Sequence, residues 1–247
     1  MVKHLSNNKI SLNEHDALLI TDMQIDFLPG GALPVEGGNE IIPVVNNYIA
    51  HFKSAGAHII ASRDWHPANH VSFQNQGGTW PTHCVQNTEG AKFSPDIKLP
   101  DHTIIISKAT DPKHEAYSVF DTTNLDNELR QLGIRRLFVA GFATDYCVVN
   151  TVIDAIKLGF EAIVLTDATL GINLIPGDVD RAFQVMSKNG ARQATDEDFA
   201  EPFDKLPIEE TSSDSTSEKT SMLTDAKKKA RMRSKGVNKR IKTEGRH

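Results

Sequence analysis

The chain has 247 residues, 39% of them hydrophobic and 24% charged, a composition typical of a globular protein with one sizeable core. No apolar run reaches the roughly 18 residues that a membrane-spanning helix needs, and residues 1–16 lack the apolar core of a signal peptide. The two cysteines, Cys84 and Cys147, cannot form a disulfide framework, so we expect free thiols and a cytoplasmic location.

Short apolar runs alternate with helical patterns along most of the chain. In chain order we predict a strand at 17–21, a helix at 41–52, strands at 57–62 and 103–107, a helix at 124–133, a strand at 136–141, a helix at 145–159, a strand at 161–166, a helix at 178–190 and a sixth strand near 191–194. This alternation predicts a single α/β domain with a mainly parallel six-stranded sheet between helices, a Rossmann-like three-layer arrangement. In such folds ligands bind beyond the carboxyl ends of the strands.

The balance of charge changes near the C-terminus. Residues 1–200 carry 15 Lys+Arg and 24 Asp+Glu, a net charge of -9, whereas residues 201–247 carry 12 and 8, a net charge of +4. The second part is rich in Ser, Thr and charged residues and has few apolar ones, so it lacks the surface that a folded core must bury. We therefore predict a folded domain at 1–204 and a disordered tail at 205–247.

A basic run within that tail, KKKARMR at 227–233, has two readings. It resembles a nuclear-localisation signal or a patch that contacts polyanions, which would add import machinery as a partner and the nucleus as a location. It is equally well explained as a solvated charge run without a partner. The acidic composition of the rest of the chain argues against nucleic-acid binding by the folded domain.

Reactive side chains follow four of the predicted strands. Asp22 and Lys108 come directly after the first and third strands, Arg63 and Asp64 follow the second, and Cys147 lies at the start of the helix that follows the fourth. A cysteine there lies near unpaired N–H groups and the positive end of the helix dipole, which favour a thiolate and can bind an oxyanion. With an acid to accept the thiol proton and a lysine to stabilise charge, the group predicts a cysteine nucleophile. Separately, each residue also fits an ordinary structural role.

A second group has the composition of a metal site. Asp64 and His66 are two residues apart, so in an extended segment their side chains point the same way, and His83 follows after a glycine-containing loop. One carboxylate and two imidazoles suit zinc, iron or manganese. His70, in the same loop, is either a further ligand or a residue that surrounds the ligands without binding the metal. Spacing alone is explained equally well by unrelated loop residues.

Five segments in order give the chain a family resemblance. They are TDMQIDF (21–27), SRDWHPANHVSF (62–73), WPTHCVQNTEGAKF (80–93), SKATDPKHEAYSVF (107–120) and GFATDYCV (141–148). Together they resemble nicotinamidases of the isochorismatase-like hydrolase superfamily. The resemblance covers about residues 16–200 and departs from the usual pattern at Val119, where a small residue is common.

The resemblance implies hydrolysis of nicotinamide to nicotinate and ammonia, a step of NAD salvage, through a cysteine thioester. By the match of motifs, Cys147 is the nucleophile and Asp22 the general base and then acid. Lys108 lowers the pKa of the thiol and stabilises charge. The family also implies a cis peptide between Phe142 and Ala143, and an oxyanion hole made by the N–H groups of Ala143 and Cys147.

The resemblance further implies one divalent metal ion, zinc in the first instance, with iron and manganese as alternatives. Asp64, His66 and His83 match the family's ligands. The metal would position the pyridine ring of the substrate, so that the amide faces the cysteine. The residues that match the ring pocket are Phe27, Trp80 and Tyr117.

Three other functions stay open at this point. A different amidase or isochorismatase-like hydrolase would share the fold, although the complete metal motif argues against branches that lack it. An iron oxygenase would use two histidines and a carboxylate, but it leaves Lys108 and Cys147 unexplained. A nucleic-acid-associated protein would use the basic tail. The sequence leaves the oligomeric state open, including a homo-oligomer.

Overall fold

The structure is a computed structural model, and it describes residues 9–201 and 203. One sheet has the strand order β3-β2-β1-β4-β5-β6, and every pair of neighbouring strands is parallel. The strands are β1 (Asp16–Thr21), β2 (His58–Asp64), β3 (Ile104–Lys108), β4 (Arg136–Phe142), β5 (Glu161–Leu170) and β6 (Arg192–Ala194). The predicted α/β fold with a six-stranded parallel sheet is confirmed for these residues. The predicted tail, with its basic run, lies outside them.

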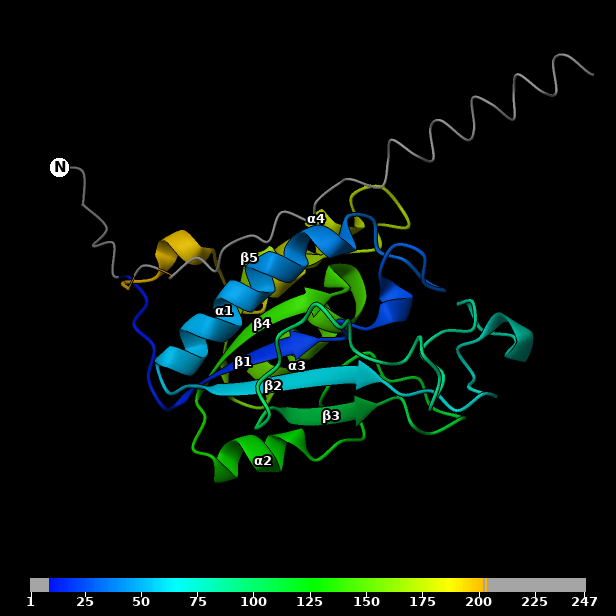
Figure 1. Cartoon of the computed structure of the whole chain (residues 1–247), viewed down its shortest axis with the longest axis horizontal. Coiled ribbons are helices and arrows are strands. Elements are labelled where there is room, and N and C mark those ends of the chain that lie inside the picture. Colours follow the sequence, from blue (N-terminus) through cyan, green and yellow to red (C-terminus); the bar gives the residue numbers. More distant parts are fainter. Residues whose placement is uncertain (1–8, 202, 204–247) are drawn as a thin grey trace, which may run out of the picture. The chain divides into compact units, whose positions relative to one another are not determined.

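Helices cover both faces of the sheet, as Figure 1 shows with α1 in front and α3 behind. The helices are α1 (Ile42–Ser54), α2 (Leu125–Gln131), α3 (Val149–Lys157) and α4 (Asp178–Lys188). Alternate residues of a strand point to opposite faces. Leu18 and Ile20 of β1 therefore share a core with α1, whereas Ala17 and Leu19 share the opposite core with α2, α3 and α4. Burial on both faces explains why β1 reads as a continuous apolar run.

Two elements differ from their predicted bounds. β5 continues to Leu170, past the predicted end at 166, and its pairing with β4 shifts register between Val139 and Gly141. The end of β5 is still paired with β4, with Thr169 opposite Gly141, and the Thr169 hydroxyl also donates to the Gly141 carbonyl at 2.7 Å. The predicted helix at 145–159 begins with a π-helical turn, Thr144–Val148, before α3. Turns of this kind occur often at functional sites.

The strand order brings four chain segments to one edge of the sheet. In Figure 1 the arrowheads of β1, β2, β3 and β4 all point toward the same side. β4 reaches β1 closely at that edge because residue 141 is a glycine with φ of 101°. A Cβ there would lie only 2.1 Å from the Thr21 carbonyl oxygen, so a side chain at this position would force the two strand ends apart.

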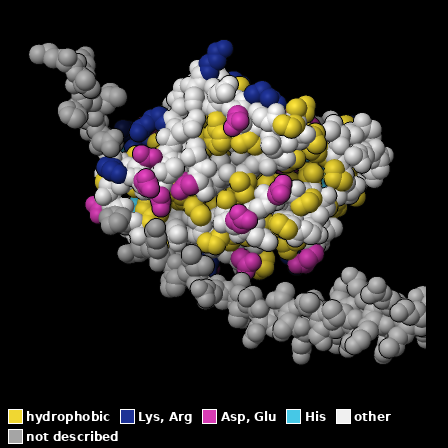
Figure 2. All heavy atoms as spheres, turned by 90° about the horizontal axis from the view of Figure 1, so that it is seen from above, with side chains coloured by type: hydrophobic (Ala, Val, Ile, Leu, Met, Phe, Trp, Pro, Cys, Tyr) yellow, Lys and Arg dark blue, Asp and Glu magenta, His cyan; other side chains and the backbone are white. Residues whose placement is uncertain are grey.

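Acidic side chains are scattered over the face drawn in Figure 2, between apolar ones, in keeping with the net charge of -9 that residues 1–200 carry. A surface of this kind disfavours contact with phosphate backbones. Within the part of the chain that the structure describes, no helix has the length and apolar character to cross a membrane.

Truncation after residue 204 should leave thermal stability and catalytic activity nearly unchanged. The last described residue, Phe203, still contributes to the core, because its ring stacks on His51 with centroids 4.0 Å apart and meets Tyr48 at 5.0 Å. Residues 205–247 follow that contact and lack an apolar composition. Thermal unfolding and turnover of the full and shortened chains test this. A loss of activity would move the domain boundary toward the C-terminus.

Candidate active site

Lys108 lies at the centre of the predicted catalytic group and is buried. Its Nζ lies 3.1 Å from Asp22 Oδ2 and 2.5 Å from Asp64 Oδ1. The same atom lies 3.3 Å from Cys147 Sγ. The parallel register that pairs Lys108 with Asp64 across β2 and β3 sets this geometry. One ammonium group therefore contacts the predicted nucleophile, the predicted base and a predicted metal ligand.

The charges of this group stabilise one another. Burial alone would lower the pKa of Lys108, but the carboxylates of Asp22 and Asp64 raise it well above its usual value. Burial would raise the pKa of Asp64, yet Lys108 holds it well below its usual range. The lysine is therefore a cation and Asp64 an anion at neutral pH. Two carboxylates around one ammonium leave an excess of negative charge when both are ionised, which suits a cation-binding site.

Asp22 and Cys147 form an acid–thiol pair. Asp22 has a φ of 53°, uncommon for a residue other than glycine and typical of functional positions. Its Oδ1 accepts a hydrogen bond from the Ser62 hydroxyl at 2.7 Å. Burial raises the pKa of Asp22, and Lys108 opposes the shift. Burial also raises the pKa of the Cys147 thiol well above its usual value, against the lowering by Lys108. The resting thiol therefore keeps its proton, and a neighbouring base is needed to remove it.

The predicted metal ligands come together. Ligand atoms of Asp64, His66 and His83 all lie within 4.8 Å of one another, and all three residues are buried. Both ring nitrogens of His66 are buried without a hydrogen-bond partner. Pro81 accepts a hydrogen bond from His83 Nδ1 at 2.7 Å, which leaves Nε2 with a free lone pair. A buried imidazole without a partner is costly, and a bound metal removes that cost. The donor set fits a divalent transition metal.

His70 does not join this group. Its Nε2 donates to the His114 carbonyl at 3.0 Å, so its Nδ1 accepts from the Ser72 hydroxyl at 2.7 Å. Both nitrogens are thus engaged, although the ring lies next to that of His66 with centroids 4.3 Å apart. Of the two roles left open by the sequence, the structure supports the neighbour over the ligand.

The His70→Gln variant should keep its bound metal. No free lone pair of His70 points to the group, so its replacement removes a packing neighbour and not a ligand. Elemental analysis of protein purified without chelator would give the metal content of the variant and of the parent chain. A stoichiometric loss of metal in the variant would instead make His70 a ligand.

An aromatic pocket adjoins the catalytic and metal residues. Trp80 Nε1 donates to the Tyr117 hydroxyl at 3.0 Å, and the ring of Phe27 meets that of His83 edge to face at 5.6 Å. The residues that line the cavity are Phe27, Leu33, Asp64, His66, Trp80, His83, Glu115, Tyr117, Ala143, Tyr146, Cys147 and Ile172. The three predicted ring-pocket residues and Ala143 are all among them. The peptide bond between Phe142 and Ala143 is cis, as the resemblance implies.

Comparison with known proteins identifies the family. Residues 16–198 match the model of the isochorismatase domain. The chain belongs to the isochorismatase family. Family members that it resembles include the nicotinamidase of Escherichia coli, 41% identical over 75% of this chain and 97% of that protein. A nicotinamidase/pyrazinamidase of Mycobacterium tuberculosis is 36% identical over 64% and 87%, respectively. These relatives and the domain match make the chain an amidohydrolase.

Two solved structures agree with this chain in fold. The pyrazinamidase of Pyrococcus horikoshii, in complex with zinc, has a TM-score of 0.71 and 52% identity, over 73% of this chain and 99% of that one. PnC1 of L. infantum, in complex with nicotinate, has a TM-score of 0.71 and 32% identity, over 77% and 98%. Together with the donor set described above, the zinc complex supports a divalent metal in this isochorismatase-family site.

Several side chains of the site were not predicted. Tyr146 lines the pocket and meets Trp80 edge to face with centroids 4.9 Å apart; its place next to Cys147 was the available signal. Glu115 also lines the pocket. Ser62, which donates to Asp22, could have been found from the sequence, because residues two apart in a strand share a face and Ser62 lies two residues before Asp64. Val119, the departure from the family pattern, is buried in the core shared with α2 and does not line the pocket.

Proposed function

We propose that the chain hydrolyses nicotinamide to nicotinate and ammonia, in NAD salvage, through a thioester on Cys147. The observation that carries the proposal is the position of Lys108, which contacts Asp22, Cys147 and the metal-ligand Asp64 at once. Relatives support the choice of substrate: they are named nicotinamidases, and one was solved with nicotinate. An aromatic pocket beside the thiol suits a flat ring.

The first half of the reaction forms the thioester. Asp22 takes the proton of the Cys147 thiol, and Sγ attacks the amide carbon. N–H groups of Ala143 and Cys147 would hold the resulting oxyanion, and the ammonium of Lys108 compensates the charge that moves between Asp22 and the sulfur. Protonated Asp22 then passes its proton to the amide nitrogen, the C–N bond breaks, and ammonia leaves.

The second half returns the enzyme to its starting state. Asp22, now ionised again, removes a proton from a water molecule as that water attacks the thioester carbon. When the tetrahedral intermediate collapses, the C–S bond breaks and the proton returns to Sγ. The products are the Cys147 thiol and nicotinic acid, whose carboxyl proton passes to the released ammonia to give nicotinate and ammonium, so that one water is consumed for each amide hydrolysed. Asp22 serves as base and acid in both halves, which its burial and raised pKa suit.

Asp64, His66 and His83 would hold one divalent metal ion, which we propose to be zinc. When bound, the metal offers a Lewis-acid site for the pyridine nitrogen, and this interaction would orient the ring. The zinc complex of the Pyrococcus horikoshii relative supports the choice over iron or manganese. An iron oxygenase would use the same ligands, but it gives no role to the buried contact between Lys108 and Cys147.

Nicotinamide and benzamide together test this function. Purified protein with one equivalent of zinc should release ammonia and nicotinate from nicotinamide in equal amounts. Benzamide has the same amide on a ring without nitrogen, so its hydrolysis should be slower by about 100-fold or more if the ring nitrogen supplies positioning energy. No ammonia from nicotinamide would refute the proposed activity. Equal rates of hydrolysis for the two amides would still support an amidase, but they would refute the role of the metal in positioning the ring.

A further inference from the structure

Gln24 is a buried amide that clamps the backbone of a predicted metal ligand. Its Oε1 accepts a hydrogen bond from the Asp64 N–H at 2.7 Å, and its Nε2 donates to the Asp64 carbonyl at 2.8 Å. The second hydrogen of Nε2 goes to the Ala91 carbonyl at 2.9 Å. Gln24 is 0% exposed, so no water competes for these bonds. Both N–H groups of the Gln24 amide therefore donate to backbone carbonyls, one in the segment of Asp64 and one in the segment of Ala91.

The two segments are those that carry the ligands. Asp64 ends β2, and Ala91 belongs to the connection from β2 to β3, which also contains His83. The backbone around Gln24 bonds to the same connection, because the Ile25 N–H donates to the Lys92 carbonyl at 2.9 Å. Gln24 thus lies between the strand that presents the carboxylate and the loop that presents an imidazole.

Asp26, two residues after Gln24, also holds the backbone next to a predicted ligand, in this case His83. Asp26 Oδ2 accepts a hydrogen bond from the N–H of Cys84, the neighbour of His83, at 2.7 Å. The Cys84 carbonyl in turn accepts from the His66 N–H at 3.0 Å. A Cβ on Gly90 would lie 2.2 Å from the Asp26 carboxylate, so the loop approaches this acid closely. The turn after β1 therefore bonds to the backbone of Asp64 and to that of Cys84 beside His83, and Cys84 extends this network to the backbone of His66.

We propose that Gln24 is a positioning residue for the metal centre, which fixes the distance between Asp64 and the loop of His83. The inference rests on the proposed function in one respect, that Asp64, His66 and His83 hold a metal. Gln24 contacts neither the metal ligands' donor atoms nor the pocket, so its effect passes through the backbone. Substitution of a residue that orients a metal ligand without binding the metal commonly lowers metal affinity by about 10- to 100-fold.

The Gln24→Met variant tests the inference, because methionine has a similar length but neither donates nor accepts strongly. Zinc affinity is measured by competition with a chromophoric chelator, and cobalt-substituted protein reports ligand geometry through its visible absorption. We expect zinc affinity to fall by about 10- to 100-fold and the cobalt spectrum to change. If Gln24→Met does not fold, Gln24→Asn keeps the amide but is one methylene too short to reach both segments.

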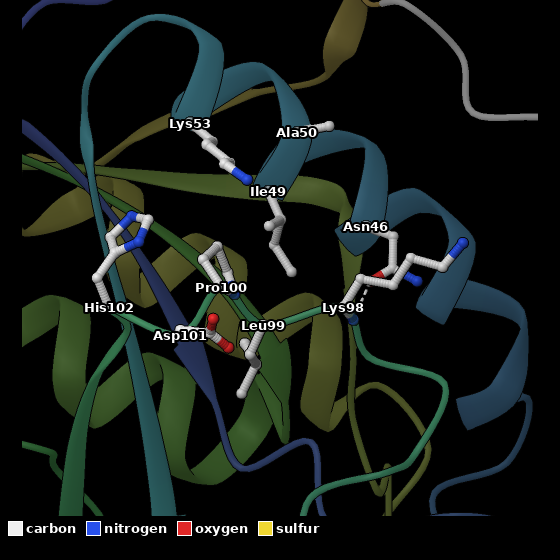
Figure 3. A pocket seen from close by; sticks show the side chains of 9 residues that line it. All are labelled: Asn46, Ile49, Ala50, Lys53, Lys98, Leu99, Pro100, Asp101 and His102. Carbon is white, nitrogen blue, oxygen red and sulfur yellow. Dashed lines mark hydrogen bonds between the residues drawn. The ribbon is translucent and has the colours of Figure 1, made fainter.

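Asn46 offers a matched control elsewhere in the fold. Its Nδ2 donates to the Asp96 carbonyl at 2.8 Å, and its Oδ1 accepts from the Lys98 N–H at 2.8 Å, so it clamps a loop as Gln24 does. Figure 3 draws the bond between Asn46 and Lys98 as a dashed line, beside a hollow between α1 and the loop before β3. The volume of this hollow is about 440 Å³. None of the predicted site residues lines that hollow. Asn46→Leu should lower thermal stability without a change in zinc affinity or cobalt spectrum.

The outcomes of these measurements distinguish the positioning role of Gln24 from the proposed metal site on which it rests. A parent chain that binds no zinc would contradict the proposed metal site itself. A parent chain that binds zinc, with a folded Gln24 variant within about twofold of its affinity, would overturn the positioning role alone. Equal losses in the Gln24 and Asn46 variants would show that general destabilisation explains the effect, and this too would overturn it.

Discussion

The Cys147→Ala variant should lose about 10⁴-fold or more of its kcat for nicotinamide, because no other group near the amide carbon can form the covalent intermediate. The sulfur lies 3.3 Å from Lys108 Nζ, and the Asp22 carboxylate lies 3.1 Å from the same nitrogen. Removal of the thiol leaves this ion pair intact. We therefore expect a folded protein, which thermal unfolding and zinc content would verify beside steady-state kinetics.

Cys84→Ala is the matched control for that experiment. Cys84 is also a buried free thiol, but its side chain packs in the core shared with α1, and its hydrogen bonds to Asp26 and His66 are made by its backbone, which alanine keeps. This variant should keep turnover close to that of the parent chain. With the parent chain, rapid quenching during turnover should reveal an acyl group on the peptide that contains Cys147. Turnover that survives in Cys147→Ala, or an acyl group found elsewhere, would exclude the thioester mechanism.

Loss of the metal should have the second largest effect. His66→Ala removes a predicted ligand whose two ring nitrogens make no hydrogen bond and whose Nε2 lies 3.6 Å from Asp64 Oδ2, so we expect the chain to lose bound zinc. Without a Lewis acid to orient the ring, KM for nicotinamide should rise and kcat should fall, together by about 100-fold or more in kcat/KM. Benzamide cannot use that interaction, so its slow hydrolysis should change much less. Elemental analysis and kinetics on both amides measure these effects.

A surface histidine provides the control for this variant. The side chain of His114 is exposed and contacts Asp121 at 2.9 Å, whereas its bond to His70 is made by the backbone carbonyl, which alanine keeps. His114→Ala should keep both zinc and the preference for nicotinamide over benzamide. If His66→Ala retains a full equivalent of zinc, the ligand assignment is wrong. If it loses zinc but keeps its preference between the two amides, the metal has another role than ring positioning.

Much of the fold was predictable because its signals are local. The strands buried on both faces appear as continuous apolar runs, and glycines follow several helices, as Gly133 and Gly159 do with positive φ. The extension of β5 to Leu170 was not predictable, because its polar end is held by Thr169 bonding to Gly141 of a neighbouring strand. The π-helical turn before α3 likewise has no distinct local signal.

The catalytic and metal-ligand candidates of the site were predicted from the sequence, but Tyr146, Glu115 and Ser62 were not, and neither were the contacts that connect the site. Strand-end positions indicated Asp22, Lys108 and Cys147, because parallel strands bring their carboxyl ends together. That Lys108 also contacts Asp64 depends on the register of β2 against β3, which a sequence does not give. The role of His70 depends on two hydrogen-bond partners. The clamp by Gln24 joins residues 24, 64 and 91, and no local pattern encodes such a contact.

The shared contacts of Lys108 also constrain how such a site can change in evolution. A lineage that lost its metal by replacing Asp64 would leave the buried ammonium with Asp22 as its one carboxylate partner. The stronger pairing would then hold Asp22 ionised and poorly able to give a proton to the departing nitrogen. Replacement of Asp64 would thus also require changes that restore the pKa of Asp22. We expect metal-free relatives that descend from such a site to carry compensating substitutions around Lys108.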